Sequence, residues 1–302
     1  MNKYARTISA WATWLGVLVW TGTALAQTTW VVDADGAGSA ADCNSSGPAI
    51  TTVQAAINAA APGDTVFVCP GIYAEQVVIG KDNLTLLGAG VATVLRPLSV
   101  PVISTSLTLG SPMRPIVLVQ ASGVRIRDLK VDGSLADSGA ILLPHCPALG
   151  FYLGVYFRGG SGTLSGAHVT GIESASHCGH GVRAEQATVT IANSRVDRYS
   201  VNGISCVGDQ ATCAITGNLV RGLGPVKNQI QSGIQVRSAA SGLIRGNAVT
   251  DHFRIGAHGV PDSSVGIFLV YADPTSNPHI VVENTFSNNQ VNVQRLGTAA
   301  AF

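Results

Sequence analysis

Three copies of one short pattern constrain the fold of this chain more than any other feature. They begin GISCV at Gly203, GIQVR at Gly233 and GIFLV at Gly266. Each copy has an alternating apolar run, a small polar turn, a second apolar run, and an Asn followed by an apolar residue. Alternation with a period of two residues indicates β-strands, and repetition at a fixed period indicates a stacked fold. Because the turns are short and no helices intervene, a βαβ sheet is excluded and we predict a parallel β-helix, one coil per copy.

Further copies precede these three and begin at Gly181, Gly154 and Gly123. One apolar position of each coil is expected to point inward. These positions are Ile126, Leu164, Ile191, Ile215, Ile244 and Val281. They are 24 to 38 residues apart, and we interpret the longer spacings as coils that carry inserted loops.

An asparagine recurs at one position of the repeat, at Asn218, Asn247 and Asn284. Asn tolerates the left-handed backbone conformation that a tight bend needs. Stacked Asn side chains can also hydrogen-bond along the stack. We therefore predict an asparagine ladder at the sharp bend of the coil.

The first 26 residues have the pattern of a secretion signal. Two basic residues precede an apolar segment, Ile8–Trp20, and the small residues of Ala24–Ala26 fit a cleavage site. We predict a signal peptide over 1–26, with a membrane anchor as the alternative, and one elongated domain over 27–302. No other stretch is long enough to span a bilayer, so we expect a secreted or periplasmic protein.

Charge and cysteine content narrow the class of protein. The formal net charge is +1, so nothing suggests a nucleic-acid partner. Six cysteines in a chain with an export signal favour disulfides over free thiols. We predict the pairs Cys43–Cys69, Cys206–Cys213 and, from the two that are left, Cys146–Cys178.

Residues 51–90 combine a helix signal with short strands. Thr51 or Thr52 can cap an Ala-rich helix within 51–62, which Pro62-Gly63-Asp64 ends. A helix laid over the first coil would cover the open end of the stack.

This stretch resembles the N-terminal cap and first coils of the pectin lyase-like superfamily of right-handed β-helices. It is most similar to pectinesterases, which open with a VQAAI helix, a PG-Y-E turn and an LTL-G-G strand. The resemblance implies an all-β fold, a single-stranded right-handed parallel β-helix with a short N-terminal capping helix. It does not extend to pectinesterase activity, because the QAVAL-type, QDTL-type and DFIFG-type catalytic segments are absent. Gly179-His180-Gly181 is similar to a polygalacturonase motif, but the Asp and Arg-x-Lys partners of that motif are missing.

The Gly-initiated strands are expected to place two columns of side chains on the outside of the coil. One column contains Tyr156, Arg183, Ser205, Gln235 and Phe268, and the other Arg158, Glu185, Val207, Arg237 and Val270. The long insertions 133–153, 222–232 and 251–265 precede these strands, so we expect them to border a groove. Folds of the superfamily place carbohydrate clefts on this face, so the resemblance implies the same location.

This face is rich in Arg, and Arg binds carboxylates in bidentate fashion. We therefore predict that the protein binds acidic, uronate-containing polysaccharide and, if it is an enzyme, cleaves it by β-elimination. The catalytic candidates are His180, Arg183, Glu185 and Tyr156, and the substrate-binding candidates are Arg158, Gln235, Arg237 and Phe268. The alternatives are an ordinary solvated sheet face and a non-catalytic β-helix, such as a surface or adhesion protein.

Elimination needs a group that neutralises the carboxylate, a base and often an acid. Arg183 or Arg237 could neutralise, and His180 or Tyr156 could exchange the proton. Hydrolysis needs two carboxylates, and this face offers Glu185 alone unless Asp132 or Asp197 reaches around from the preceding strand.

No cofactor motif is evident, although calcium is a possible ligand of such a site. Asp33-Ala34-Asp35-Gly36 resembles the start of a calcium loop but lacks the later ligands, so we interpret it as a plain turn. The sequence carries no signal of the oligomeric state.

Overall fold

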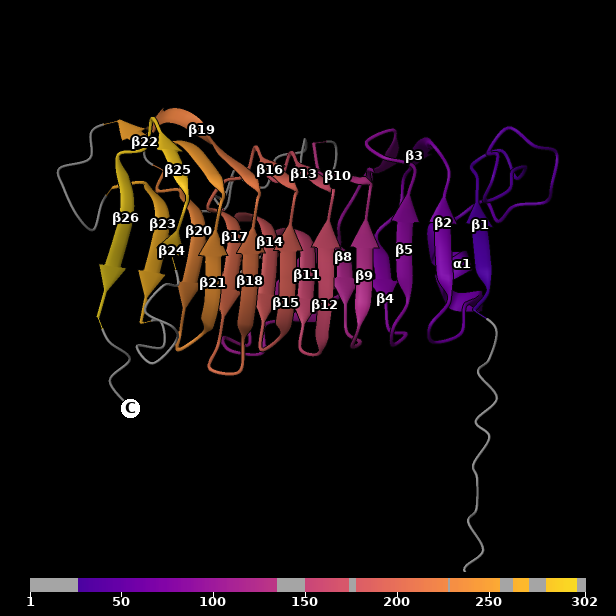
Figure 1. Ribbon diagram of the computed structural model, residues 1–302, viewed down its shortest axis with the longest axis horizontal. Coiled ribbons are helices and arrows are strands. Elements are labelled where there is room, and N and C mark those ends of the chain that lie inside the picture. The colour runs from indigo at the N-terminus through magenta and orange to yellow at the C-terminus, as the bar shows by residue number, and fades with distance from the viewer. Residues whose placement is uncertain are drawn as a thin grey trace, which may run out of the picture.

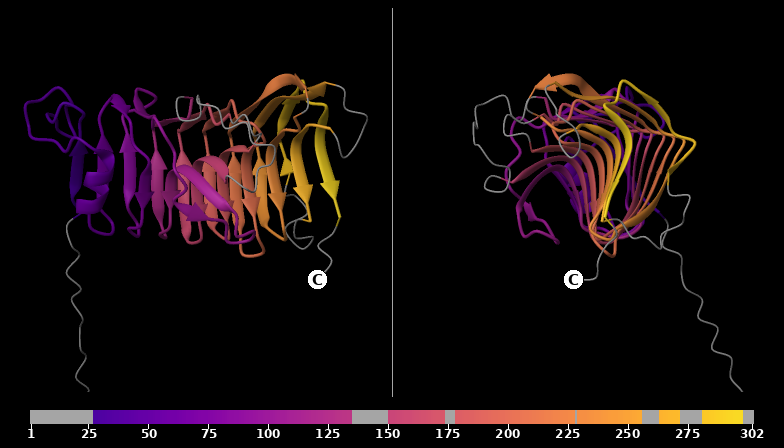
Figure 2. Two further views of the ribbon diagram at one scale, coloured as in Figure 1. Left: turned by 180° about the vertical axis from the view of Figure 1, so that it is seen from behind. Right: turned by 90° about the vertical axis from the view of Figure 1, so that its left-hand side faces the viewer.

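Successive turns of the chain stack along one axis and form a parallel β-helix (Figure 1). Viewed along this axis, the coils superimpose around one common interior (Figure 2). The structure is a computed structural model, and it describes residues 27–134, 150–173, 178–227, 229–255, 263–271 and 281–297. The predicted signal peptide lies outside these residues. In the part of the chain that the structure describes, no helix has the length and hydropathy needed to span a membrane.

Three sheets form the sides of the coil, and each full coil gives one strand to each sheet. Sheet 1 consists of β1 (Thr29–Val32), β2 (Thr65–Val68), β5 (Thr85–Gly88), β9 (Val124–Arg127), β12 (Ser161–Ser165), β15 (Thr188–Ala192), β18 (Thr212–Thr216), β21 (Ser241–Arg245) and β24 (Val281–Val282). Sheet 2 consists of β3 (Gly71–Tyr73), β6 (Thr93–Leu95), β10 (Lys130–Asp132), β13 (His168–Thr170), β16 (Arg195–Asp197), β19 (Leu219–Lys227), β22 (Ala248–Ile255) and β25 (Thr285–Ser287).

Sheet 3 is the side on which the sequence places the candidate site. It consists of β4 (Val77–Ile79), β8 (Pro112–Val119), β11 (Phe151–Arg158), β14 (Gly179–Glu185), β17 (Asn202–Val207), β20 (Ser232–Arg237), β23 (Val265–Val270) and β26 (Val291–Leu296). A short strand, β7 (Ser104–Thr105), pairs with β8, and this is the one antiparallel pairing among the strands described.

The predicted inward positions form one continuous column in sheet 1. Leu164 pairs with Ile126 and Ile191, and Ile215 pairs with Ile191 and Ile244. These five side chains are all fully buried, and burial of one such side chain stabilises the fold by about 1.5–3 kcal/mol. Stacked apolar columns of this kind set the register of the coils, because a slip of one residue would turn every apolar side chain outward.

The helix that caps the stack is α1 (Val53–Ala59), shorter than the predicted 51–62. Thr52 is its N-cap, and its hydroxyl accepts a hydrogen bond from the backbone N–H of Ala55 at 3.3 Å. The Glu75 carboxylate accepts the N–H groups of Val53 at 2.8 Å and Gln54 at 2.9 Å, where a negative charge stabilises a helix start. The helix ends before Ala61 because a residue that precedes proline disfavours helical backbone angles.

The asparagine ladder is confirmed. Asn218 Nδ2 donates to Asn247 Oδ1, and Asn247 Nδ2 donates to Asn284 Oδ1, both at 2.9 Å. The expectation that these Asn residues themselves adopt the left-handed conformation was wrong. The left-handed backbone lies one residue earlier, at Gly217 (φ 65°), Gly246 (φ 65°) and Glu283 (φ 56°). The preceding residue makes the bend, which leaves the Asn amide free to bond along the stack.

Two of the predicted insertions begin as extensions of sheet 2 and not as loops. β19 and β22 continue past a register shift and pair from Gly224 to Lys227. The alternating exposure of residues 219–227 shows that this segment keeps the extended geometry. Residue 228 of the first of these insertions, residues 256–262 of the second, and most of the insertion after Gly133 lie outside the described residues.

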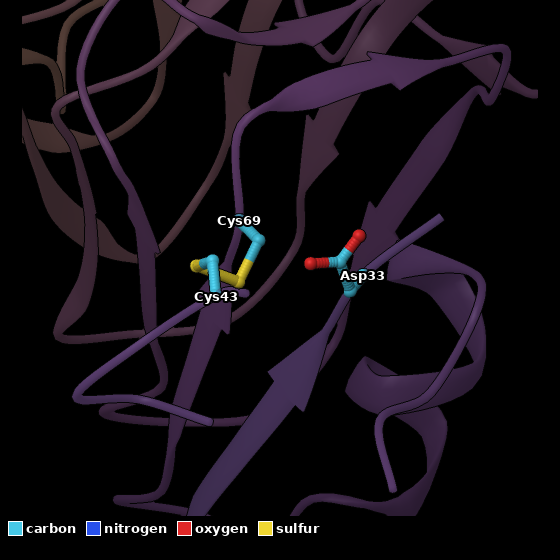
Figure 3. A group of neighbouring side chains, drawn as sticks. All are labelled: Asp33, Cys43 and Cys69. Atoms are coloured by element: carbon cyan, nitrogen blue, oxygen red, sulfur yellow. A yellow bond between two sulfur atoms is a disulfide. The ribbon is translucent and has the colours of Figure 1, made fainter. Parts of the chain in front are cut away.

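Two predicted disulfides are present, Cys43–Cys69 and Cys206–Cys213. Cys178 is also disulfide-bonded, and Cys146, its predicted partner, lies outside the described residues. The Asp33 carboxylate lies beside the first disulfide (Figure 3).

Candidate functional site

The two outward columns predicted from the sequence are present on sheet 3. Backbone pairing aligns the first column in the order Tyr156, Arg183, Ser205, Gln235 and Phe268. It aligns the second in the order Arg158, Glu185, Val207, Arg237 and Val270. The repeat in the sequence therefore brings the candidate residues together as expected.

One end of this face is covered and not open to solvent. Tyr156 and Glu185 are each 0% exposed, and Arg183 is 3% exposed. The segment that begins with β7 lies against these residues, since Ser106 Oγ donates to Glu185 Oε1 at 2.6 Å. Thr105 anchors the same segment through its carbonyl, which accepts from Arg158 Nε at 2.8 Å. The expected groove is therefore closed at the β11–β14 end.

Glu185 is the centre of the covered region. Its carboxylate accepts from Arg183 Nη2 at 2.9 Å, from the N–H of Thr108 at 3.1 Å, and from the Tyr156 hydroxyl. Burial acts to raise the pKa of Glu185, but Arg183 and the hydroxyl donors outweigh it and lower the pKa to about 2. Burial and the neighbouring Glu185 raise the pKa of Tyr156 far above its usual range. Both groups thus keep one protonation state near neutral pH, which favours a structural role over proton transfer.

His180 lies on the same face and is 4% exposed. Its Nδ1 is 3.2 Å from the side-chain nitrogen of Asn202, which also donates to Gln235 Oε1 at 3.1 Å. Burial, followed by the charges of Arg183 and Arg237, lowers the pKa of His180 to about 3. The imidazole is therefore neutral, and because Nδ1 accepts, the ring proton resides on Nε2.

Several polar atoms of this face are buried without a hydrogen-bond partner. Among the described residues they are His180 Nε2, Arg183 Nε, Asn202 Oδ1, Arg237 Nε, and both side-chain polar atoms of Gln294. A buried polar group without a partner destabilises a fold by about 1–3 kcal/mol, and such groups are uncommon in native proteins. They form a mixed set of donors and acceptors that a ligand with hydroxyl and carboxylate oxygens would satisfy.

The β20–β26 end of the face is more accessible. Arg237 and Phe268 are partly exposed, whereas Gln235 is 9% and Gln294 8% exposed. The pairing of β20 with β23, and of β23 with β26, places these residues in adjacent coils.

Two residues of this site were missed from the sequence. Asn202 pairs with His180 and Ser232 one position before the repeated glycines, so extension of the repeat by one residue would have found it. Gln294 pairs with Phe268 on β26. This last coil was overlooked because Asn292 occupies the place where the other copies have Gly.

Asp132 and Asp197, considered as hydrolytic partners of Glu185, lie on sheet 2. Both line a separate cavity there and contact side chains of their own sheet, Asp132 with Lys130 and Asp197 with Thr170. The described part of sheet 3 therefore offers no pair of carboxylates for hydrolysis.

Among the described residues, one group of potential metal ligands clusters within 4.8 Å, namely Asp33, Cys43 and Cys69 (Figure 3). The two sulfur atoms are joined in a disulfide. Because thiolates and not disulfide sulfurs bind metals, these residues do not make a metal site in this state.

Comparison with known proteins agrees with this architecture. Residues 153–300 match a family model described as "Right handed beta helix region". Pectin methylesterase from Erwinia chrysanthemi has the same fold, with a TM-score of 0.50, 14% identity, and coverage of 89% of this chain and 81% of that one. Pectin methylesterase from Aspergillus niger also has this fold, with a TM-score of 0.50, 13% identity, and coverage of 91% of this chain and 87% of that one. No curated protein sequence matches the chain.

The protein is therefore a right-handed parallel β-helix with the fold of the pectin lyase-like superfamily, as the N-terminal cap implied. At 13–14% identity the likeness to the two methylesterases concerns the fold alone.

Proposed function

We propose that the protein binds acidic, uronate-containing polysaccharide on the outer face of sheet 3. The observation that carries this proposal is the set of buried, unpartnered polar atoms on His180, Arg183, Asn202, Arg237 and Gln294. Arg237 supplies a cation at the accessible end of the set, and Phe268, in the neighbouring coil, supplies an aromatic ring. A uronate unit would place its carboxylate on Arg237 and its hydroxyl groups on the amide and imidazole groups.

Binding is favoured over cleavage as the primary activity. Arg183 or Arg237 can neutralise a substrate carboxylate, as elimination requires, whereas the neutral His180 can donate a hydrogen bond from its Nε2–H group but is a poor general acid or base. Tyr156 does not supply the base, because its pKa is raised and its hydroxyl is donated to Glu185. Elimination remains the second candidate, and it is supported by the two arginines on this face that can neutralise a substrate carboxylate.

Calorimetric titration with polygalacturonate, alginate and a neutral glucan tests the proposal. We expect both uronate polymers to bind and the neutral glucan not to bind. Loss of one charged hydrogen-bonding group corresponds to about 1.5–3 kcal/mol, so Arg237→Ala should weaken binding by roughly 10- to 100-fold. Arg125→Ala is the matched control, because Arg125 is an exposed arginine of sheet 1.

Equal affinities of the two variants, or equal binding of the neutral glucan, would contradict the proposal. Absorbance of the unsaturated product, followed on the same polymers with and without calcium, tests elimination separately. Binding without product would leave the non-catalytic surface protein as the correct interpretation.

A further inference from the structure

A cavity of about 400 Å³ lies on sheet 2, away from the candidate site on sheet 3. It is lined by side chains from four consecutive coils. Its charged lining residues are Lys130, Asp132, His168, Arg195, Asp197, Arg198 and Arg221. Four formal positive charges, from one lysine and three arginines, thus surround two carboxylates, without counting His168.

The basic side chains are placed by the register of the coils. Lys130 pairs with His168, and His168 with Arg195, so these three stand in one column. Adjacent coils are about 4.8 Å apart, which spaces the three groups evenly. Arg221 pairs with Asp197 in the neighbouring column, and the cavity therefore has basic groups along its length.

Asp132 fixes one end of this arrangement. Its Oδ2 accepts from Arg96 Nη2 at 2.7 Å and lies 3.0 Å from Lys130 Nζ, and its Oδ1 accepts from the N–H of Ser134 at 3.0 Å. Burial acts to raise the pKa of Asp132, but the bonds from Ser134, Lys130 and Arg96 lower it well below its usual range. The carboxylate is therefore charged, and both of its oxygen atoms already have partners, among them the cationic side chains of Arg96 and Lys130.

Asp197 has the same function in the middle of the cavity. It lies 3.2 Å from His168 Nε2 and accepts from Arg195 Nε and the Thr170 hydroxyl. These donors outweigh burial and lower its pKa well below the usual range. Its oxygens are occupied, so it positions the basic groups and does not itself bind a ligand.

The arginines at the rim keep their outer nitrogen atoms available. Arg221 bonds Asp251 through Nε at 2.7 Å, and Arg198 bonds Glu173 through Nε at 2.7 Å. Their Nη atoms have no hydrogen-bond partner within the described part of the chain. The paired Nη groups of a guanidinium form the fork that binds carboxylate or phosphate oxygens.

We propose that this cavity binds a small ligand that carries an oxyanion, a carboxylate or phosphate group, on a sugar-sized body. Its volume is within the range of small-molecule sites, about 300–1,000 Å³. Lys130 and Arg195 are held by the buried carboxylates of Asp132 and Asp197, and Arg198 and Arg221 by ion pairs to the more exposed Glu173 and Asp251. Cations that are in place before the ligand arrives lower the entropy lost on binding. The site shares no residue with sheet 3, so it stands independently of the polysaccharide proposal.

The test is calorimetric titration of the full chain with galacturonic acid, glucose 6-phosphate and inorganic phosphate, with galactose and glucose as uncharged counterparts. We expect one or more of the anions to bind and neither neutral sugar to bind. The anion that binds most tightly identifies the group, and binding of inorganic phosphate alone would assign the site to phosphate. The double variant Arg198→Gln/Arg221→Gln should weaken binding at least tenfold.

Arg245→Gln is the matched control. Arg245 is 56% exposed and bonds Glu283 through Nε at 2.7 Å on sheet 1, as Arg221 is 58% exposed and bonds Asp251 at 2.7 Å. The control and Arg237→Ala should both retain wild-type affinity for the small anion. Absence of binding by all three anions, equal binding of a neutral sugar, or equal loss in the Arg245→Gln variant would overturn the proposal.

Discussion

Arg183 and Glu185 form a buried ion pair on β14, with Arg183 Nη2 2.9 Å from Glu185 Oε1 and side chains that are 3% and 0% exposed. Residues two apart on a strand point to the same face, so the sequence alone places them together. The segment around Ser106 and Thr108 completes the coordination of the carboxylate. This end of sheet 3 is consequently part of the interior, although its side chains point away from the axis of the coil.

Glu185 should make the protein sensitive to acid. Its pKa is lowered from 4.5 to about 2 in the folded state, so its stabilising effect is complete above pH 4.5 and is lost as the pH falls through 2. The corresponding free energy is on the order of 3 kcal/mol. The Glu185→Gln variant should have a free energy of unfolding about 3–5 kcal/mol lower at pH 7, since Arg183 is left buried and unpaired. Its free energy of unfolding should also fall less steeply as the pH is lowered. Urea denaturation at several pH values measures both effects, and Glu283→Gln, in an exposed pair, should change neither.

Two buried histidines should add a second pH dependence that begins at a higher pH. Burial lowers the pKa of His252 to about 4, against the opposing hydrogen bond from its ring to Asn289, and the pKa of His180 to about 3. Since both values lie below 6.5, their contribution to stability is complete above that pH and declines as the pH falls toward the folded-state values. The slope approaches about 1.4 kcal/mol per pH unit for each proton taken up on unfolding. His252→Gln should reduce the slope between pH 6 and 5 by about half, and an unchanged slope would refute this assignment.

Asn247 should be a principal stabilising residue of the bend. It is 1% exposed, accepts from the Asn218 backbone and side chain, and donates to Asn284 and to the Ile215 carbonyl. Asn247→Ala removes these bonds and leaves buried groups unpaired, so we expect a loss of roughly 2–4 kcal/mol. Guanidinium denaturation would show it, with the exposed Asn58→Ala as the control that should stay within about 0.5 kcal/mol.

Substitution by alanine should affect stability differently at two glycines on neighbouring coils. A Cβ on Gly88 would lie 2.3 Å from the Asp128 carbonyl oxygen and 2.7 Å from Leu129 Cβ, whereas a Cβ on Gly80 would meet nothing within 4 Å. Gly88→Ala should therefore destabilise the fold by about 1–3 kcal/mol. Gly80→Ala should be neutral or stabilise by up to about 1 kcal/mol, because it restricts the unfolded chain. Thermal unfolding of the two variants compares them directly, and equal melting temperatures would show that the coils can shift apart at Gly88.

The columns of this fold could be predicted from the sequence, since each coil repeats the same alternation. Counting along the repeat was enough to find the neighbours of Ile191 and Ile215 in the inward column. It also found those of Arg183 and Gln235 in the outward column. Likewise, the ladder through Asn247 followed from a residue type that recurs at one position.

The covering of Glu185 and its neighbours by the β7 segment could not be predicted, because this segment lies outside the repeat. Ser106 and Glu185 are 79 residues apart in the sequence, and nothing in the composition around Ser106 indicates which coil it contacts. The preorganised cavity on sheet 2 was missed for a related reason. Asp132 and Asp197 were considered as catalytic groups, whereas their many donors show that they hold the neighbouring bases in place.

The register between β15 and β18 runs without a shift from Thr188 opposite Thr212 to Ala192 opposite Thr216. Each position on one strand thus has its equivalent 24 residues later in the chain. Excision or duplication of that length would leave every interior column in phase. The molecule can consequently change its length by whole coils during evolution, and its outer faces can lengthen without redesign of its interior.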